Sequence, residues 1–340
     1  MARIHQASQT DVARAAGVGQ KTVSRAFGAP GYITAAMRAR VIAAAERLGY
    51  RPNTGARAMR TGRFDTVLLL QSQDHVLSYL PQELLHGIED ELQQAGIALT
   101  AGRFADTHLA ADEEFLPRTL RELSADGILI NYETNIPGEL SAHLQRHAIP
   151  AIWINSKQDA DCVHPDDQQG GRLLTEHLLA LGHRRIAYID VLLKTTPECH
   201  YSRADRLAGY RAGMQAGGLP ALPILPERAI PFAHLADWLG QALRDYTAAI
   251  TYDTNEAGAA ILGVERLGRR VPRDFSIASF SLLTNTRCGL PLTCAINPMA
   301  EMGRQAARAI RQRIAADDRP LPPLAVPFTL VASSSTAAIP

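Results

Sequence analysis

The sequence predicts a small all-α head of the helix–turn–helix type, followed by an α/β body of two lobes built on doubly wound parallel sheets. Two observations predict this arrangement. Short helical segments separated by a glycine turn lie near the start of the chain, together with its excess of positive charge. From residue 64 onward, short β-branched or leucine-rich runs alternate with longer amphipathic runs, as expected for strands that alternate with helices.

The first two helical segments have the spacing of a helix–turn–helix. The first begins at Thr10, whose hydroxyl is the expected N-cap, and Asp11 lies in its first turn. Gly17 ends it, because glycine readily adopts left-handed backbone. A second short helix is expected over 20–27, with Val23 on its inner side. Two helices joined by such a turn form the motif.

A third helix should complete the core of the head. Thr34 is its expected N-cap, and Gly49 should end it in a left-handed conformation. Apolar side chains recur along it at helical spacing: Met37, Val41, Ala44, Ala45 and Leu48. Three short helices can therefore bury a small core.

The outward face of the second helix carries Gln20, Lys21, Thr22, Ser24 and Arg25. Glutamine and arginine can bond base edges through two atoms at once, and the other side chains can bond phosphates. This is the chemistry of a recognition helix in the major groove. The alternative is an ordinary solvated face, since many surface helices carry these residue types.

Charge is divided unevenly along the chain. Residues 1–63 contain 11 Lys and Arg against two acidic residues, a balance of +9. The remainder contains 24 basic and 32 acidic residues, a balance of −8. A basic head on a mildly acidic body favours binding of a polyanion at one end.

Linked motifs in one register resemble the lactose-repressor family of bacterial transcriptional regulators, and the resemblance extends over nearly the whole chain. The motifs are TDVA at 10–13, AGV at 16–18, TVSR at 22–25, VIAAAERLGY at 41–50 and RPN at 51–53. The resemblance implies a repressor of a carbohydrate-use operon that acts as a homodimer on a pseudo-palindromic double-stranded operator. A small-molecule effector, expected to be a sugar or sugar derivative, would bind between the lobes and change operator affinity.

Other functions remain open at this point. They are a regulator with a purine-type co-repressor, a solute-binding protein without a gene-regulatory role, and an enzyme of sugar or nucleotide metabolism. Against an enzyme, the sequence has no GxSxG elbow, no HExxH motif and no complete phosphate-binding loop. Steeply salt-dependent DNA binding would separate the first possibility from the other two.

The resemblance also assigns the segment between head and body. It implies a head over 1–51, a hinge helix over 52–63 and a body over 64–340. In the minor groove, Met59 would wedge open a base step. The expected DNA contacts outside the recognition helix are Thr10, Asn53, Ala56, Arg57, Met59 and Arg60. Gly55 departs from the pattern and weakens so short a helix by about 1 kcal/mol relative to alanine, and a plain linker is the alternative.

The body should bind its ligand at the carboxyl ends of its strands, as open parallel sheets do. The resemblance implies a periplasmic-binding-protein-like effector domain. One lobe is expected over about 64–157 and 289–320, and the other over about 158–288 and 321–340. The chain should cross between the lobes near 156–163, 286–292 and 321–327.

Arg206 is the leading effector-binding candidate. It precedes an LAGY motif, where relatives place an arginine that bonds sugar hydroxyls or a carboxylate. The alternative is an ion pair with Asp205 or Asp253.

Seven further residues are candidates for the effector site. Tyr252 could stack on a pyranose face, and Asp166 could equally contact ligand or cap a helix. Trp153 could stack on a sugar, although its apolar run favours a place in the core. The full set is Ser78, Tyr79, Trp153, Asp166, Tyr252, Asp253 and Ser281.

Composition narrows the remaining possibilities. No stretch approaches the roughly 20 apolar residues that span a bilayer, and no signal peptide is recognisable, so a cytoplasmic protein located at the nucleoid when bound to DNA is expected. The four cysteines lack CxxC spacing. His143 and His147 are four residues apart without further ligands, so neither a metal nor a cofactor is expected.

Overall fold

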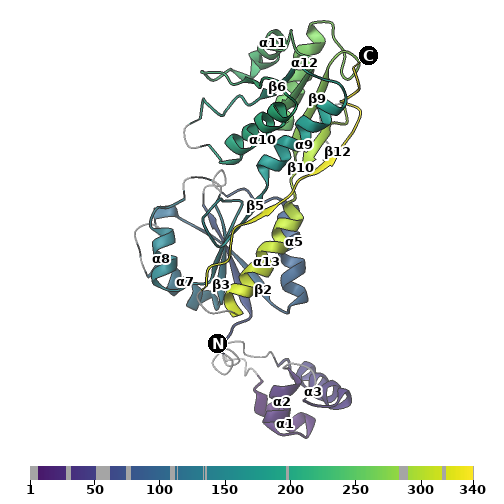
Figure 1. Cartoon of the computed structure of the whole chain (residues 1–340). Coiled ribbons are helices and arrows are strands. Elements are labelled where there is room, and N and C mark those ends of the chain that lie inside the picture. Colours follow the sequence, from purple (N-terminus) through teal and green to yellow (C-terminus); the bar gives the residue numbers. More distant parts are fainter. Residues whose placement is uncertain are drawn as a thin grey trace. The chain divides into compact units, whose positions relative to one another are not determined.

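A computed structural model of the chain describes residues 7–27, 32–50, 62–73, 78–107, 112, 114–132, 134, 136–196, 199–282, 290–315 and 319–339. The chain divides into two compact units, Met1–Phe64 and Asp65–Pro340 (Figure 1). The predicted combination of a helical head and a two-lobed α/β body is confirmed. Within the described residues, no helix is long and apolar enough to cross a membrane.

The head consists of three helices around a small apolar core. They are α1 (Gln9–Ala16), α2 (Gln20–Ala26) and α3 (Ala35–Arg47). The completely buried core side chains are Val12, Val23 and Val41. Gly17 (φ 61°) and Gly49 (φ 64°) both have left-handed backbone, so the helix ends predicted from these glycines are confirmed.

The N-cap of α1 is Ser8, so the prediction that Thr10 caps this helix is wrong. The Ser8 hydroxyl accepts the backbone N–H of Asp11 at 3.3 Å, and the Asp11 carboxylate accepts the backbone N–H of Ser8 at 3.0 Å. This reciprocal capping box satisfies two N–H groups at once. Thr10 lies inside the first turn, where its hydroxyl accepts from Gln20 Nε2 at 3.1 Å. Thr34 is the N-cap of α3, as predicted.

The first lobe of the body has a six-stranded sheet in the order β11-β5-β4-β3-β1-β2, and all its pairings are parallel. The strands are β1 (Thr66–Ser72), β2 (Ala98–Phe104), β3 (Gly127–Asn131), β4 (Ala151–Ile154), β5 (Cys162–Pro165) and β11 (Leu324–Val326). Helices α5 (Gln82–Gln94) and α13 (Met299–Ala315) share one apolar core with the sheet. Helices α7 (Phe115–Leu123) and α8 (Leu140–Arg146) share the other, so both faces of the sheet are covered.

The second lobe repeats this plan with the order β12-β10-β9-β8-β6-β7. Its strands are β6 (Ile186–Ile189), β7 (Leu222–Ile224), β8 (Ala248–Thr251), β9 (Ser276–Ser281), β10 (Thr293–Ile296) and β12 (Thr329–Val331). Helices α9 (Asp167–Ala180) and α10 (Ser202–Ala216) cover one face, and α11 (Phe232–Ala242) and α12 (Thr254–Arg266) cover the other. The edge strand β12 runs antiparallel to β10, an exception to the predicted parallel sheet.

The chain crosses between the two sheets three times, from β5 to α9, from β10 to α13 and from β11 to β12 (Figure 1). The first two crossings follow Pro165 and Ile296, later than the expected windows, and the third follows Val326. The expected lobe boundaries near 157, 288 and 320 are therefore displaced. A short apolar run does not reveal which sheet it joins, because its pairing partner is distant in sequence.

Glycines allow the helices within each lobe to pack closely. A Cβ on Gly171 of α9 would lie 2.3 Å from the carbonyl oxygen of Arg206 in α10. In the first lobe, a Cβ on Gly303 of α13 would lie 2.3 Å from the carbonyl oxygen of Leu84 in α5. Both lobes therefore depend on a position where only glycine fits.

The segment after β12 is integrated into the second lobe. Ser335 is completely buried. Its hydroxyl accepts the backbone N–H of Thr293 at 2.7 Å, and its carbonyl accepts that of Ile277 at 2.8 Å. The last turns of the chain thus hydrogen-bond residues of β9 and β10.

Candidate DNA interface and effector site

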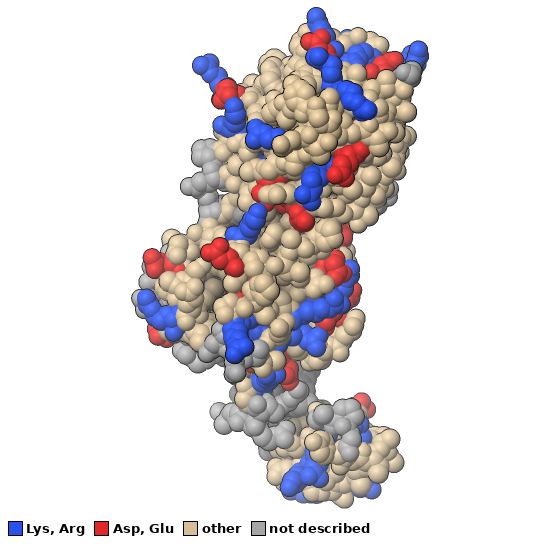
Figure 2. Space-filling view, in the orientation of Figure 1, with Lys and Arg blue, Asp and Glu red and all other residues tan. Residues whose placement is uncertain are grey.

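The outer face of α2 is polar and accessible. Gln20, Lys21 and Arg25 are exposed, while Val23 and Ala26 face the core. Figure 2 shows basic side chains on the visible surface of the head. The predicted recognition face is therefore free of contacts with the core of the head, and the long side chains on it can reach an external partner.

Neighbouring side chains restrain two members of this face. Gln20 donates to Thr10, and the guanidinium of Arg25 lies 5.9 Å from the ring centre of exposed Tyr32. Thr22 and Ser24 are partly buried at the margin of the face. The predicted hinge contacts Asn53, Ala56, Arg57, Met59 and Arg60 lie outside the described residues.

Arg206 is buried in the second lobe at the start of α10. Its Nε donates to Asp167 Oδ1 at 2.7 Å, and its Nη1 donates to the Tyr252 carbonyl at 3.1 Å. The guanidinium lies 4.2 Å from the ring centre of Phe280. The expected partners Asp205 and Asp253 are wrong, because Asp167 stands at the first position of α9, directly beside α10.

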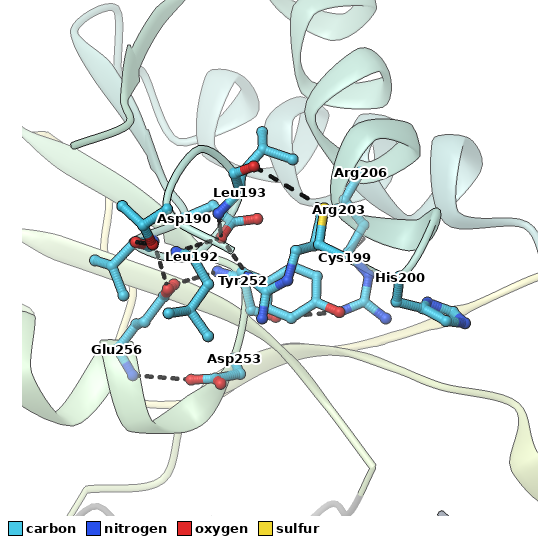
Figure 3. A network of polar contacts seen from close by, with 12 residues as sticks. Asp190, Leu192, Leu193, Cys199, His200, Arg203, Arg206, Tyr252, Asp253 and Glu256 are labelled. Carbon is cyan, nitrogen blue, oxygen red and sulfur yellow. Dashed lines mark hydrogen bonds and ion pairs between the residues drawn. The ribbon is translucent and has the colours of Figure 1, made fainter. Parts of the chain in front are cut away.

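Tyr252 lies close to the guanidinium groups of Arg203 and Arg206 (Figure 3). Arg203 is 3.8 Å from its ring centre and Arg206 is 4.6 Å away. Arg203 also forms an ion pair with completely buried Asp190. The Tyr252 hydroxyl is 2.9 Å from Ser202 Oγ. The ring that was expected to stack on a sugar is therefore already in contact with cations.

Ser202 and Arg203 were missed by the sequence analysis. They lie four and three residues before Arg206 on α10, so helical spacing could have placed them near Arg206. Asp190 follows β6, and Tyr252 follows β8. The cluster thus gathers at the carboxyl ends of two neighbouring parallel strands, where such sheets bind ligands.

A buried carboxyl group lies under this cluster. Glu256 Oε1 accepts the Val191 N–H at 2.8 Å, and Oε2 accepts the Tyr252 N–H at 3.0 Å. Burial, and after it the charge of Asp253, raises the pKa of Glu256 to about 8. Burial also raises the pKa of Asp190, although its ion pair opposes this shift. The raised pKa means that Glu256 binds a proton at neutral pH, which removes one negative charge from the site.

Two candidate carboxylates serve as helix caps. Asp166 Oδ1 accepts the Gln169 N–H at 3.0 Å and caps α9. Asp253 Oδ1 accepts the N–H groups of Asn255 and Glu256 and caps α12. Of the two interpretations of Asp166, the helix cap is the one that the contacts support. Ser281 ends β9, and its carbonyl accepts the backbone N–H of the residue after β10.

The candidates in the first lobe are held by their own lobe. Ser78 is buried, and its hydroxyl accepts the Ser72 N–H at 2.8 Å and donates to the Asn131 carbonyl. Tyr79 is 52% exposed, and its carbonyl accepts from the Asn131 side chain at 3.0 Å. Trp153 belongs to the core on the α7–α8 side of the sheet, as favoured from sequence.

Several buried polar atoms near Arg206 have no hydrogen-bond partner among the described residues. They are Asp167 Oδ2, Asp190 Oδ2 and the hydroxyl groups of Tyr188 and Tyr201. Buried polar atoms are normally hydrogen-bonded, so such a cluster suits polar ligands with hydroxyl or amino groups. Over the same described residues, no group of three or more His, Cys, Asp or Glu side chains could hold a metal ion.

The fold and these sites together define a class of protein: a DNA-binding regulator with a ligand-binding body. Residues 9–53 match the family described as bacterial regulatory proteins, lacI family, and residues 175–336 match the periplasmic binding protein-like domain. The maltose regulon regulatory protein MalI of Escherichia coli strain K12 is 30% identical, over 95% of this chain and 97% of its own length.

Solved structures agree with the fold. The Lac repressor dimer bound to operator and an anti-inducer is 22% identical, with a TM-score of 0.73 over 98% of this chain and 100% of its own. The transcriptional regulator CelR in complex with cellobiose is 25% identical, with a TM-score of 0.60 over 97% and 100%. The chain belongs to the lacI family of bacterial regulatory proteins. It is a DNA-binding transcriptional regulator and not an enzyme, which confirms both expectations.

Proposed function

We propose that this protein is a cytoplasmic repressor of a carbohydrate-use operon, acting as a homodimer on a pseudo-palindromic operator. One observation carries the proposal. The chain belongs to the lacI family, and the outer face of α2 exposes Gln20, Lys21 and Arg25 while its inner face packs against the buried core of the head. These side chains can bond base edges and phosphates from one short helix. Residues 52–63 are proposed as the hinge that enters the minor groove.

Several relatives support a carbohydrate effector. MalI is a maltose regulon regulator, CelR was solved with cellobiose, and the ribose operon repressor of Escherichia coli is 32% identical over 63% of this chain. We place the effector against Arg206 and Tyr252, where several buried oxygen atoms have no hydrogen-bond partner in the part of the chain that the structure describes. Asp253, Ser281, Ser78 and Tyr79 would line the same site at the strand ends.

A purine-type co-repressor is the second candidate. The HTH-type transcriptional repressor PurR of Vibrio vulnificus is 25% identical over 89% of this chain. The aromatic face of Tyr252 could hold a planar base by stacking. However, the Arg203 and Arg206 guanidinium groups already lie on the Tyr252 ring, which favours hydroxyl-rich ligands over stacking bases.

The operator can be found by selection, whatever its sequence. Selection from a random duplex library by the full chain should enrich two inverted half-sites, because a two-fold dimer reads a pseudo-palindrome. Binding of the selected duplex should weaken steeply with salt, since each neutralised phosphate releases counterions. Enrichment of a single half-site, or of nothing, would contradict the dimeric repressor.

The recognition helix can then be tested on the selected duplex. Lys21→Ala should weaken binding and relax the sequence preference, by about 1–3 kcal/mol for a base contact. Arg38→Ala, on α3, serves as the comparison. Fluorescence anisotropy gives both affinities, and an unchanged affinity and preference in Lys21→Ala would remove α2 as the reading element.

The effector class is tested by thermal stabilisation with mono- and disaccharides, sugar acids, sugar phosphates and purines. A ligand at about 100 times its dissociation constant adds about 2.7 kcal/mol of stability. A stabilising sugar should also release the selected duplex. A purine that strengthens DNA binding would instead establish the second candidate.

A further inference from the structure

The lobes of the body are joined by contacts at the start of α10. His200 Nε2 lies 2.9 Å from the backbone carbonyl of Asn155, which follows β4 of the first lobe. Close by, Lys157 Nζ forms an ion pair with Asp205 Oδ2 at 2.7 Å. The effector cluster around Tyr252 lies on the same helix end, which brings the joint between lobes next to the proposed effector site.

The hydrogen atoms in this joint can be assigned by elimination. A backbone carbonyl only accepts, so His200 Nε2 must carry a hydrogen and donate to Asn155. In the neutral ring Nδ1 is then an acceptor, both for the Ser202 backbone N–H at 3.3 Å and for the Ser202 hydroxyl, whose Oγ lies 2.8 Å away. Ser202 therefore gives its only hydroxyl hydrogen to His200. Its oxygen must accept from the Tyr252 hydroxyl at 2.9 Å.

The result is a directed chain of hydrogen bonds from Tyr252 through Ser202 and His200 to Asn155. It begins in the second lobe and ends in the first. Because the Tyr252 hydrogen is used within the chain, its oxygen can only accept from an effector. A donor hydroxyl placed there would extend the chain, and linked hydrogen bonds polarise one another.

The backbone conformation of Asn155 fixes the position of the carbonyl that ends this series of hydrogen bonds. Its backbone has φ 55°, a left-handed conformation that asparagine tolerates better than most residues. Its N–H donates to the Val163 carbonyl at 2.9 Å, which fixes the turn after β4. The acceptor for His200 is thus a rigid backbone group of the first lobe.

The surroundings keep the imidazole neutral. Burial lowers the pKa of His200 to about 4, helped by the charges of Arg206 and Arg203 and opposed by the bond to Asn155 and by the charge of Asp205. At neutral pH the ring therefore has one donor and one acceptor nitrogen, as the chain requires.

We propose that His200 is a latch that holds the two lobes together and connects the effector site of the second lobe with the first. This inference rests on the proposed function, because it concerns the response of that site. Nδ1 accepts a hydrogen bond from Ser202 of the second lobe, and Nε2 donates one to the backbone carbonyl of Asn155 of the first lobe. His200 is a positioning residue, and the effector itself need not touch it.

Two amide variants separate the bonds. In His200→Gln, the side-chain amide nitrogen can stand in for Nε2 and keep the bond to Asn155. In His200→Asn, the shorter amide can stand in for Nδ1 and keep the bond to Ser202, but it cannot reach Asn155. His200→Ala removes both bonds. His86→Asn, at an exposed position of α5, is the matched control.

Lobe closure can be measured in the full chain without effector or DNA. A carbodiimide joins amines to carboxylates that are in contact, so the Lys157–Asp205 ion pair reports contact between the lobes. The Lys194–Glu227 ion pair lies wholly in the second lobe and is the internal standard. Peptide mass spectrometry gives the ratio of the two products.

The native chain, His200→Gln and His86→Asn should give similar ratios. The ratio should fall about five-fold in His200→Asn and His200→Ala, the factor expected when one hydrogen bond holding the closed state is lost. A native ratio in His200→Asn, or the same loss in His200→Gln as in His200→Ala, would show that His200 only packs and would overturn the latch. The proposed function is decided separately by DNA and sugar binding.

Discussion

The two lobes of the body share one architecture but differ at the ends of their strands. In the first lobe, Ser78 bonds Ser72 and Asn131, although the Asn131 side-chain oxygen has no partner among the described residues. In the second lobe, Arg206 and Asp167 form a buried ion pair beside carboxylate oxygens that no described residue bonds. The comparison teaches that a repeated fold can place a buried ion pair at the strand ends of one lobe and hydrogen bonds between neutral groups at those of the other.

The largest expected effect comes from breaking the buried pair. Asp167→Ala leaves the Arg206 charge buried and uncompensated, and should lower the free energy of unfolding by about 3–5 kcal/mol. Glu91→Ala in the first lobe removes a carboxylate whose partners Arg308 and Arg311 are 49% and 40% exposed, so about 1 kcal/mol is expected. Urea unfolding measures both, and equal losses would erase the contrast.

The pH dependence of the free energy of unfolding should have opposite signs for a carboxyl group of the second lobe and one of the first. The folded-state pKa of Glu256 is about 8, above its ordinary 4.5, so its contribution is complete below pH 4.5 and is lost as the pH rises toward 8. Glu301 of α13 has a lowered pKa, because Arg304 bonds its carboxylate, so its contribution is lost as the pH falls. Glu256→Gln should flatten the decline between pH 5 and 8 by up to a few kcal/mol. Glu301→Gln should affect only the acid side. Unfolding curves across pH would contradict this if Glu256→Gln kept the native slope.

Packing, in contrast, should be alike in the two lobes. Gly171→Ala and Gly303→Ala each place a Cβ 2.3 Å from a backbone oxygen of the facing helix. Each should lower the free energy of unfolding by about 1–3 kcal/mol, because the helices must move apart. Gly138→Ala is a control with open space around the added methyl. Thermal unfolding of the three variants tests whether the symmetry holds, and a loss in one lobe only would break it.

A smaller effect is expected at Ser78 than at the buried ion pair or the close-packed glycines. Ser78→Ala removes one acceptor and one donor inside the first lobe, and should lower the free energy of unfolding by about 1–2 kcal/mol. Ser334→Ala, at an exposed position, should change it by less than about 0.5 kcal/mol. If the urea midpoints of the two variants coincide, the hydrogen bonds of Ser78 do not stabilise the first lobe.

The sequence predicted what depends on local signals. Gly17, Gly49 and Thr34 end or cap helices through their own backbone or side chain, and the structure confirms them. The first cap was wrong because Ser8 and Thr10 are both good caps, and only the reciprocal bond with Asp11 decides between them.

Long-range partners were not accessible to the same reasoning. Asp167 is 39 residues from Arg206 in the chain, so proximity in sequence suggested Asp205 instead. The sheet joined by β5 or β10 likewise depends on strands far away in sequence. The resemblance supplied the family and the Arg206 position, helical spacing could have added Arg203, and His200 required the geometry.

The three crossings between the sheets also bear on how the protein is made. The first lobe needs α13 and β11, and the second needs β12 and the buried Ser335 near the end of the chain. Domains usually fold as they leave the ribosome, starting from the N-terminus. The first lobe cannot be completed before β11 is synthesised, nor the second before Ser335, so both sheets of the nascent body stay incomplete long after the three helices of the head have been made.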